Sequence, residues 1–197
     1  MDELILFYYC IWFIYILVYF FMQPSFISKL LLLFILIYIC ISPYFVWIGS
    51  LYVSLSFCLL LITVSVLFGL SLIKAGDLLV TFMCMISYVG LLLWEKLAPV
   101  LVFIPSKFWI AITIVFIVRF LLRTFMNQVI VIGIGLSWGQ LMYELILIDY
   151  GLEQLIGSYE YMNYLATTII CLFITESFVY LLKKIIYRRK IQMYINN

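Results

Sequence analysis

The sequence predicts an all-α fold, a polytopic bundle of about seven membrane-spanning helices with the N-terminus outside and the C-terminus in the cytoplasm. Of its 197 residues, 69% are hydrophobic and 10% are charged, whereas a soluble domain carries about 25% charged residues. The hydrophobic residues form runs of about 20, the length that a helix needs to cross the hydrocarbon core. Basic residues gather in alternate connections between these runs. We therefore expect residues 1–197 to form a single integral membrane domain.

The first three predicted spans have recognisable breaks at or near their ends. The first ends at Gln23-Pro24, the second contains Pro43 near its far end, and the third is followed by the turn Lys74–Asp77. The runs are apolar on all faces, whereas the strands of a membrane barrel alternate over about ten residues, so helices are predicted. The seven spans cover about residues 4–22, 30–47, 51–73, 78–94, 108–126, 129–148 and 161–182.

Two connections are longer than the others. Residues 95–107 hold Pro99 and Pro105 around an apolar run that is too short to cross the membrane, which predicts an interfacial or re-entrant loop at the outer face. Residues 149–160 form an acidic outer loop. The cytoplasmic connections are tight, and residues 183–197 are expected to form a basic cytoplasmic tail.

The distribution of basic residues sets the span count and the orientation, because basic residues resist translocation. Nine of the eleven fall in alternate connections or in the tail, and only Lys96 and Lys107 fall on the other side. The nine are Lys29, Lys74, Arg119, Arg123, Lys183, Lys184, Arg188, Arg189 and Lys190. An odd number of spans with an outer N-terminus keeps all nine on the cytoplasmic side, and six spans cannot.

Ionisable residues within the spans are the candidate functional residues, because a charge in hydrocarbon is costly unless it is paired or hydrated. Gln140 and Glu144 share one helical face, which predicts a polar contact that lines a solute or proton path. Alternatively, Glu144 lies about one turn below the outer interface and reaches water. Arg119 and Glu176 lie at similar depth, which predicts a buried ion pair. Alternatively, Arg119 extends to the cytoplasmic surface and Glu176 meets Lys183 or water.

The sixth span carries Gly135 and Gly139, a spacing of small residues that favours close helix packing. We expect this contact within the monomer, with a dimer interface as the alternative. The five cysteines lie in apolar stretches without metal-ligand spacing. There is no histidine, no phosphate-binding loop and no other catalytic motif. We expect neither enzyme activity, nor a cofactor, nor a bound metal, and the net charge of +2 argues against a nucleic-acid partner.

The start of the chain resembles one known family. The acidic residues Asp2 and Glu3 precede an aromatic first span that closes in Tyr19-Phe20-Phe21-Met22, a single basic residue follows, and the length is near 200 residues. This layout resembles the YphA-like integral membrane protein family of Gram-positive spore-formers. The resemblance implies a multi-pass membrane protein, and it supplies no function and no site residues.

Two classes of function fit these features. We expect a non-enzymatic accessory or assembly subunit that acts through helix–helix association in the bacterial plasma membrane. The alternative is a small-solute permease, or the substrate-binding subunit of a transporter, with Gln140, Glu144 and Glu176 near the path. A hydrated cavity that reaches Gln140 would favour the second class, and a dry interior the first. The expected partners are the lipid bilayer and other membrane proteins, and the sequence leaves the oligomeric state open.

Overall fold

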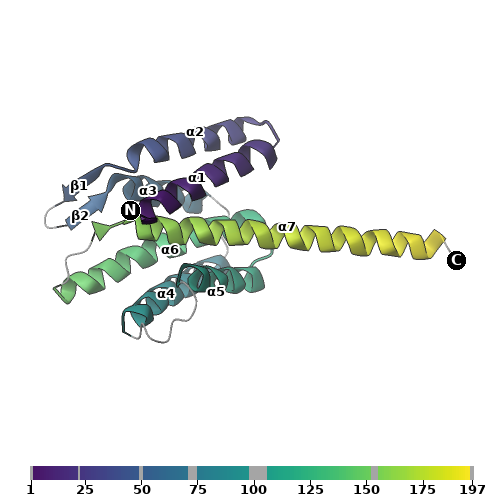
Figure 1. The fold of residues 1–197 in the computed structure, drawn as a ribbon. Helices are drawn as coiled ribbons and strands as arrows, with labels where there is room; N and C mark the ends of the chain where they lie inside the picture. Colours follow the sequence, from purple (N-terminus) through teal and green to yellow (C-terminus); the bar gives the residue numbers. More distant parts are fainter. Residues whose placement is uncertain are drawn as a thin grey trace.

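The computed structural model describes residues 2–21, 23–48, 51–70, 75–97, 106–151 and 155–195. Within these residues the chain is mostly helical, as predicted, and consecutive helices run in alternating directions (Figure 1). The helices are α1 (Asp2–Phe21), α2 (Phe26–Ile41), α3 (Leu55–Leu70), α4 (Ala75–Leu97), α5 (Ser106–Leu121), α6 (Phe125–Asp149) and α7 (Tyr159–Ile195). The strands are β1 (Phe45–Ile48), β2 (Leu51–Ser54) and β3 (Leu155–Ile156).

Three helices in the described part of the chain are long and apolar enough to cross a membrane. They are α4, α6 and the portion of α7 from Tyr159 to Val179. The described apolar parts of α1, α2 and α3, residues 5–20, 28–41 and 55–70, are shorter than the 18 residues of a full span. Length and composition therefore identify three candidate spans among the described residues, and the seven spans expected from the sequence stay a prediction.

A small sheet replaces the ends of two predicted spans. The second span was expected to reach residue 47 and the third to begin at residue 51, but α2 ends at Ile41 and residues 45–54 supply β1 and β2. Pro43 has no backbone N–H and cannot continue the helix, and the residues after it are mainly β-branched or aromatic, which favours strands. β1 pairs antiparallel with β2, and β2 pairs in parallel with β3. In the part of the chain that the structure describes, the fold is therefore mainly α-helical with one three-stranded sheet.

Several helix ends also differ from the predicted span ends. α4 begins at Ala75, so Asp77 belongs to a helix rather than to a turn, and it ends at Leu97, beyond the predicted residue 94. α7 continues to Ile195, past the predicted end at residue 182. Polar residues near a helix end can extend the helix beyond its apolar run, which is why hydropathy alone misplaces such ends. Lys74 and most of the predicted re-entrant loop, residues 98–105, lie outside the described residues.

α6 is the central helix, and it packs against α3, α4, α5 and α7. Its two predicted packing glycines face α4. A Cβ atom at Gly135 would lie 2.9 Å from Cβ of Cys84, and one at Gly139 would lie 2.8 Å from Cδ1 of Tyr88. Both distances are too short for carbon atoms in contact. The glycines therefore let α4 and α6 approach closely within one chain.

This contact can be tested with two glycine substitutions. Gly139→Ala should lower the free energy of unfolding by about 1–2 kcal/mol, because Tyr88 is fully buried and must shift to admit the methyl group. Gly90→Ala on α4 is the matched control: a Cβ atom there meets nothing within 4 Å, and alanine favours a helix by up to about 1 kcal/mol. Thermal unfolding of the purified protein measures both, and equal effects would contradict the close contact.

Candidate functional site

A polar cavity of about 340 Å³ lies at the end of the bundle where α4 and α6 end and α7 begins. Charged, amide and tyrosine side chains dominate its wall, although the surrounding helices are strongly apolar. The lining residues are Leu92, Glu95 and Lys96 of α4, Gln140, Tyr143 and Glu144 of α6, Ser158, and Glu160, Tyr161 and Tyr164 of α7. Lys96 and Glu160 are exposed, so the cavity reaches the surface at this end of the bundle.

A chain of hydrogen bonds leads to a buried carboxylate in the cavity wall. The Tyr88 hydroxyl donates to Oε1 of Gln140 at 2.8 Å, and Nε2 of Gln140 donates to Oε1 of Glu144 at 2.6 Å. Only 3% of Gln140 and 2% of Glu144 are exposed. The second oxygen of Glu144, Oε2, is buried and has no hydrogen-bond partner among the residues that the structure describes. Buried polar atoms are normally paired, so this oxygen stands out as an unsatisfied acceptor in a residue that lines the cavity.

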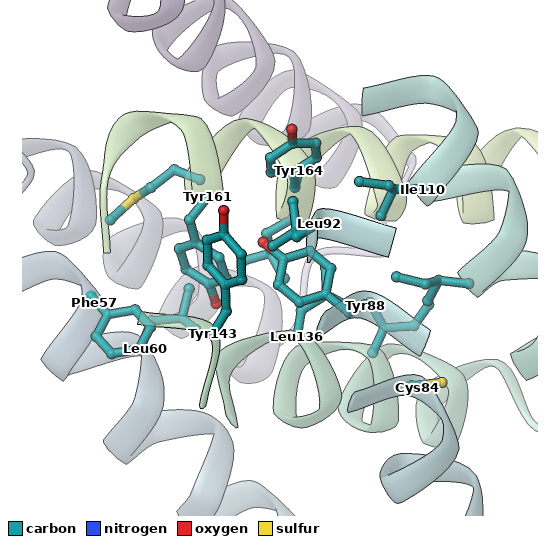
Figure 2. Close-up of a cluster of buried hydrophobic side chains, with 14 of the residues drawn as sticks. Phe57, Leu60, Cys84, Tyr88, Leu92, Ile110, Leu136, Tyr143, Tyr161 and Tyr164 are labelled. Carbon is teal, nitrogen blue, oxygen red and sulfur yellow. The ribbon is translucent and has the colours of Figure 1, made fainter. Parts of the chain in front are cut away.

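Four tyrosines gather around the hydrogen bonds that lead to Glu144. Figure 2 shows Tyr88 of α4, Tyr143 of α6, and Tyr161 and Tyr164 of α7 gathered in one group, with Leu92 beside them. The rings of Tyr88 and Tyr164 meet edge to face, with centroids 6.1 Å apart. Such contacts stabilise aromatic pairs by about 0.5–1.5 kcal/mol beyond their buried area. The tyrosine group therefore supplies both rigid packing and hydroxyl groups next to the cavity.

The tyrosine hydroxyls also tie the cavity wall together. The hydroxyl of Tyr161 shares a 2.8 Å hydrogen bond with Ser137, which lies deeper on α6. The Tyr164 hydroxyl lies 3.3 Å from Oε2 of Glu95 and 3.3 Å from Oε1 of Glu160. Its single proton is therefore shared between two carboxylates of the rim, one from α4 and one from α7.

The predicted site residues separate into two places. Gln140 and Glu144 meet at the cavity, whereas Arg119 and Glu176 form a salt bridge elsewhere, between α5 and α7. Arg119 also donates to Oε1 of Gln128 at 3.3 Å. Gln128 and Glu144 are 16 residues apart on α6, which corresponds to about 24 Å along the helix. Glu176 is therefore remote from the solute path on which the sequence placed it.

The Arg119–Glu176 pair is less enclosed than the sequence predicted. The side chain of Arg119 is 24% exposed and that of Glu176 is 43% exposed on the protein surface. The alternative partner of Glu176, Lys183, lies where side chains are not described. Both ends of the pair nonetheless belong to helices that pack against each other, so the salt bridge links α5 to α7.

Of the residues that line the cavity, sequence reasoning identified only Gln140 and Glu144 as site residues. Glu95 was assigned to a loop and Glu160 to an acidic outer loop, and none of the four tyrosines was named as a site residue. One local signal existed. Glu160 and Tyr164 lie four residues apart and therefore share one face of a helix. The contribution of Tyr88 could not be recognised, because it depends on a contact between residues 52 positions apart.

Comparison with known proteins gives a family for the chain. The model of the family described as YphA-like integral membrane protein matches residues 3–194, nearly the whole sequence. No curated protein and no solved structure matched the chain.

Proposed function

We propose, for a chain that belongs to the YphA-like integral membrane protein family, that it binds a small polar solute within its helix bundle. It would act as a small-solute permease or as the substrate-binding subunit of a transporter, and not as an enzyme. The observation that carries the proposal is the cavity in whose wall the buried carboxylate of Glu144 has an unpaired oxygen. Intramembrane ionisable groups that face a cavity commonly mark solute or ion paths.

The depth of the cavity supports this role. Glu144 precedes the end of α6 by five residues and Gln140 by nine, which corresponds to about 7 and 13 Å along the helix. Polar side chains therefore extend about two turns into a bundle whose surface is largely apolar. An unpaired carboxylate oxygen at this depth is costly, and a donor from a bound solute would remove that cost.

We further propose that the cavity faces the outside of a bacterial plasma membrane, in a chain that crosses it several times. Lys29 lies in the first turn of α2, and Arg123 follows the end of α5. These helix ends lie at the end of the bundle opposite to the cavity (Figure 1). Basic residues accumulate on the cytoplasmic side, which supports an outward-facing cavity.

An accessory subunit that acts through helix association is the second candidate. An apolar groove of about 130 Å³ lies between α1, α2 and α7, with Phe7, Phe34 and Leu165 among its lining residues. A partner helix could pack there. The glycine face of α6, however, already packs against α4 within the chain, so it does not support association with a second protein.

Water access to the cavity distinguishes the two candidates. In a variant without the five native cysteines, Leu92→Cys should react with a membrane-impermeant thiol reagent, because Leu92 lines the cavity. Met142→Cys is the control: Met142 is 42% exposed on the apolar surface of α6 and does not line the cavity. Labelling of Leu92→Cys alone supports solute binding. A failure to label Leu92→Cys would contradict it and favour the accessory role.

Solute movement tests the function itself. Proteoliposomes should take up members of a panel of small cationic, neutral and anionic solutes, and Glu144→Gln should reduce the uptake at least tenfold. Asp149→Asn should leave uptake unchanged, because Asp149 is exposed at the end of the same helix and does not line the cavity. Equal uptake by the wild-type protein and Glu144→Gln would overturn the role given to this carboxylate.

A further inference from the structure

Oε2 of Glu144 has no hydrogen-bond partner among the described residues, and a carboxylate oxygen can accept a hydrogen bond. We propose that the cavity binds a small organic cation with a primary ammonium group, whose N–H donates to Oε2 of Glu144. This inference rests on the proposed solute-binding function and names the class of its solute.

The direction of the hydrogen bonds is the first argument for a solute that donates a hydrogen bond. The Tyr88 hydroxyl occupies Oε1 of Gln140, and the amide of Gln140 donates to Oε1 of Glu144. The second of these bonds ends on the carboxylate and favours its ionised, accepting form. An ionised carboxylate has acceptor sites only, so in that form the unpaired Oε2 needs a donor, which a cationic solute would supply. An ammonium group supplies three N–H donors and no acceptor.

The charge of the cavity wall is the second argument, and it favours a cationic solute. Three carboxylates line the cavity, from Glu95, Glu144 and Glu160, against one ammonium group, from Lys96. A buried charge is stabilised when an opposite charge lies beside it. A cationic solute meets this need, an anion would add to the repulsion, and a neutral solute would leave the carboxylate of Glu144 uncompensated.

The tyrosine rings are the third argument for an organic cation. Tyr143, Tyr161 and Tyr164 line the same cavity, and aromatic faces attract cations by about 0.5–2 kcal/mol. The volume of about 340 Å³ lies in the range of pockets that bind small organic ligands, about 300–1,000 Å³. Rings and carboxylates together match a solute with an apolar body and one charged nitrogen.

A divalent metal ion fits these residues less well. Among the described residues, no group of three or more Asp, Glu, Cys or His side chains lies close enough to hold a metal. Glu95 and Glu160 lie at the rim, where they share the Tyr164 hydroxyl as a donor. Only one carboxylate, that of Glu144, stands at the buried end, which suits a singly charged ammonium group.

Three probes of the same shape test the solute class: cyclohexylamine, which is cationic at neutral pH, cyclohexanol and cyclohexanecarboxylate. We expect cyclohexylamine alone to raise the unfolding temperature of the purified protein and to slow the labelling of Leu92→Cys. Glu144→Gln should weaken its binding at least tenfold, and Asp149→Asn should not. If Glu144→Gln does not fold, Glu144→Asp, which keeps the charge on a shorter side chain, should bind cyclohexylamine measurably more weakly than the wild type.

The possible outcomes test the cationic class of the solute and the solute-binding function independently. Equal protection of Leu92→Cys by cyclohexanol or cyclohexanecarboxylate would overturn the cationic class, while solute binding in the cavity would stand. Binding of cyclohexylamine with unchanged affinity in Glu144→Gln or Glu144→Asp would overturn the assigned contact. Unreactive Leu92→Cys without any probe would overturn solute binding itself.

Discussion

Gly157→Ala should lower the stability of the purified protein more than any other single-methyl change described above. Gly157 joins β3 to α7 with a φ of +75°, a conformation that costs an L-residue about 1–2 kcal/mol. A Cβ atom there would also lie 2.3 Å from Cβ and 2.6 Å from Cγ of Phe57, a core residue that is 2% exposed. Overpacking of this kind typically costs a further 1–3 kcal/mol, roughly. We expect a total loss of about 2–5 kcal/mol.

Gly151→Ala distinguishes the cost of the positive φ from the cost of overpacking against Phe57. Gly151 has nearly the same φ, +74°, but a Cβ atom there would meet nothing within 4 Å. It should therefore show the conformational cost alone. Thermal unfolding followed by tryptophan fluorescence measures both variants, and equal losses would contradict the contact between Gly157 and Phe57.

The same substitution reaches the proposed site. Gly157 immediately precedes Ser158, and Glu160, Tyr161 and Tyr164 follow within two turns, so displacement of this junction moves one wall of the cavity. If Gly157→Ala still folds, the reactivity of Leu92→Cys toward the thiol reagent should change, whereas Gly151→Ala should leave it close to the wild-type value.

Hydropathy predicted the helices well. A run of about 20 apolar residues that lies in hydrocarbon must satisfy its backbone hydrogen bonds internally, and a helix does so within one segment. Hydropathy could not predict the sheet, because residues 45–54 are as apolar as the helices on either side of them. Whether such residues form strands depends on a partner, and the partner of β2 is β3, about 100 positions away. Two local signs were present: Pro43, and the dipeptide Gly49-Ser50 between two short runs rich in β-branched and aromatic residues.

The candidate site was predictable in part for a related reason. Gln140 and Glu144 lie four residues apart, so helix geometry alone places their side chains together. Their link to Tyr88 and the enclosure by Tyr161 and Tyr164 depend on how α4, α6 and α7 pack. The glycines at positions 135 and 139 set that packing, but their sequence could not identify α4 as the helix in contact.

Arg119→Ala should destabilise the protein by about 3 kcal/mol, because it leaves Glu176 without its salt bridge. In a protein of an integral membrane family, the exposed part of Glu176 on α7 would face hydrocarbon, where a lone carboxylate costs about 2.5–3.5 kcal/mol. Arg123→Ala is the control, because Arg123 is exposed beyond the end of α5. We expect it to change stability by less than about 0.5 kcal/mol.

The double variant Arg119→Ala/Glu176→Gln should recover most of this loss, because a neutral amide is less costly to leave unpaired than a carboxylate. Unfolding in lipid nanodiscs measures the two single variants and the double variant. The size of the effect also locates the pair, since an ion pair in water contributes only about 0–1 kcal/mol. A loss below about 1 kcal/mol in Arg119→Ala, or purely additive effects in the double variant, would place Arg119 and Glu176 at the aqueous surface, where neither charge depends on the other.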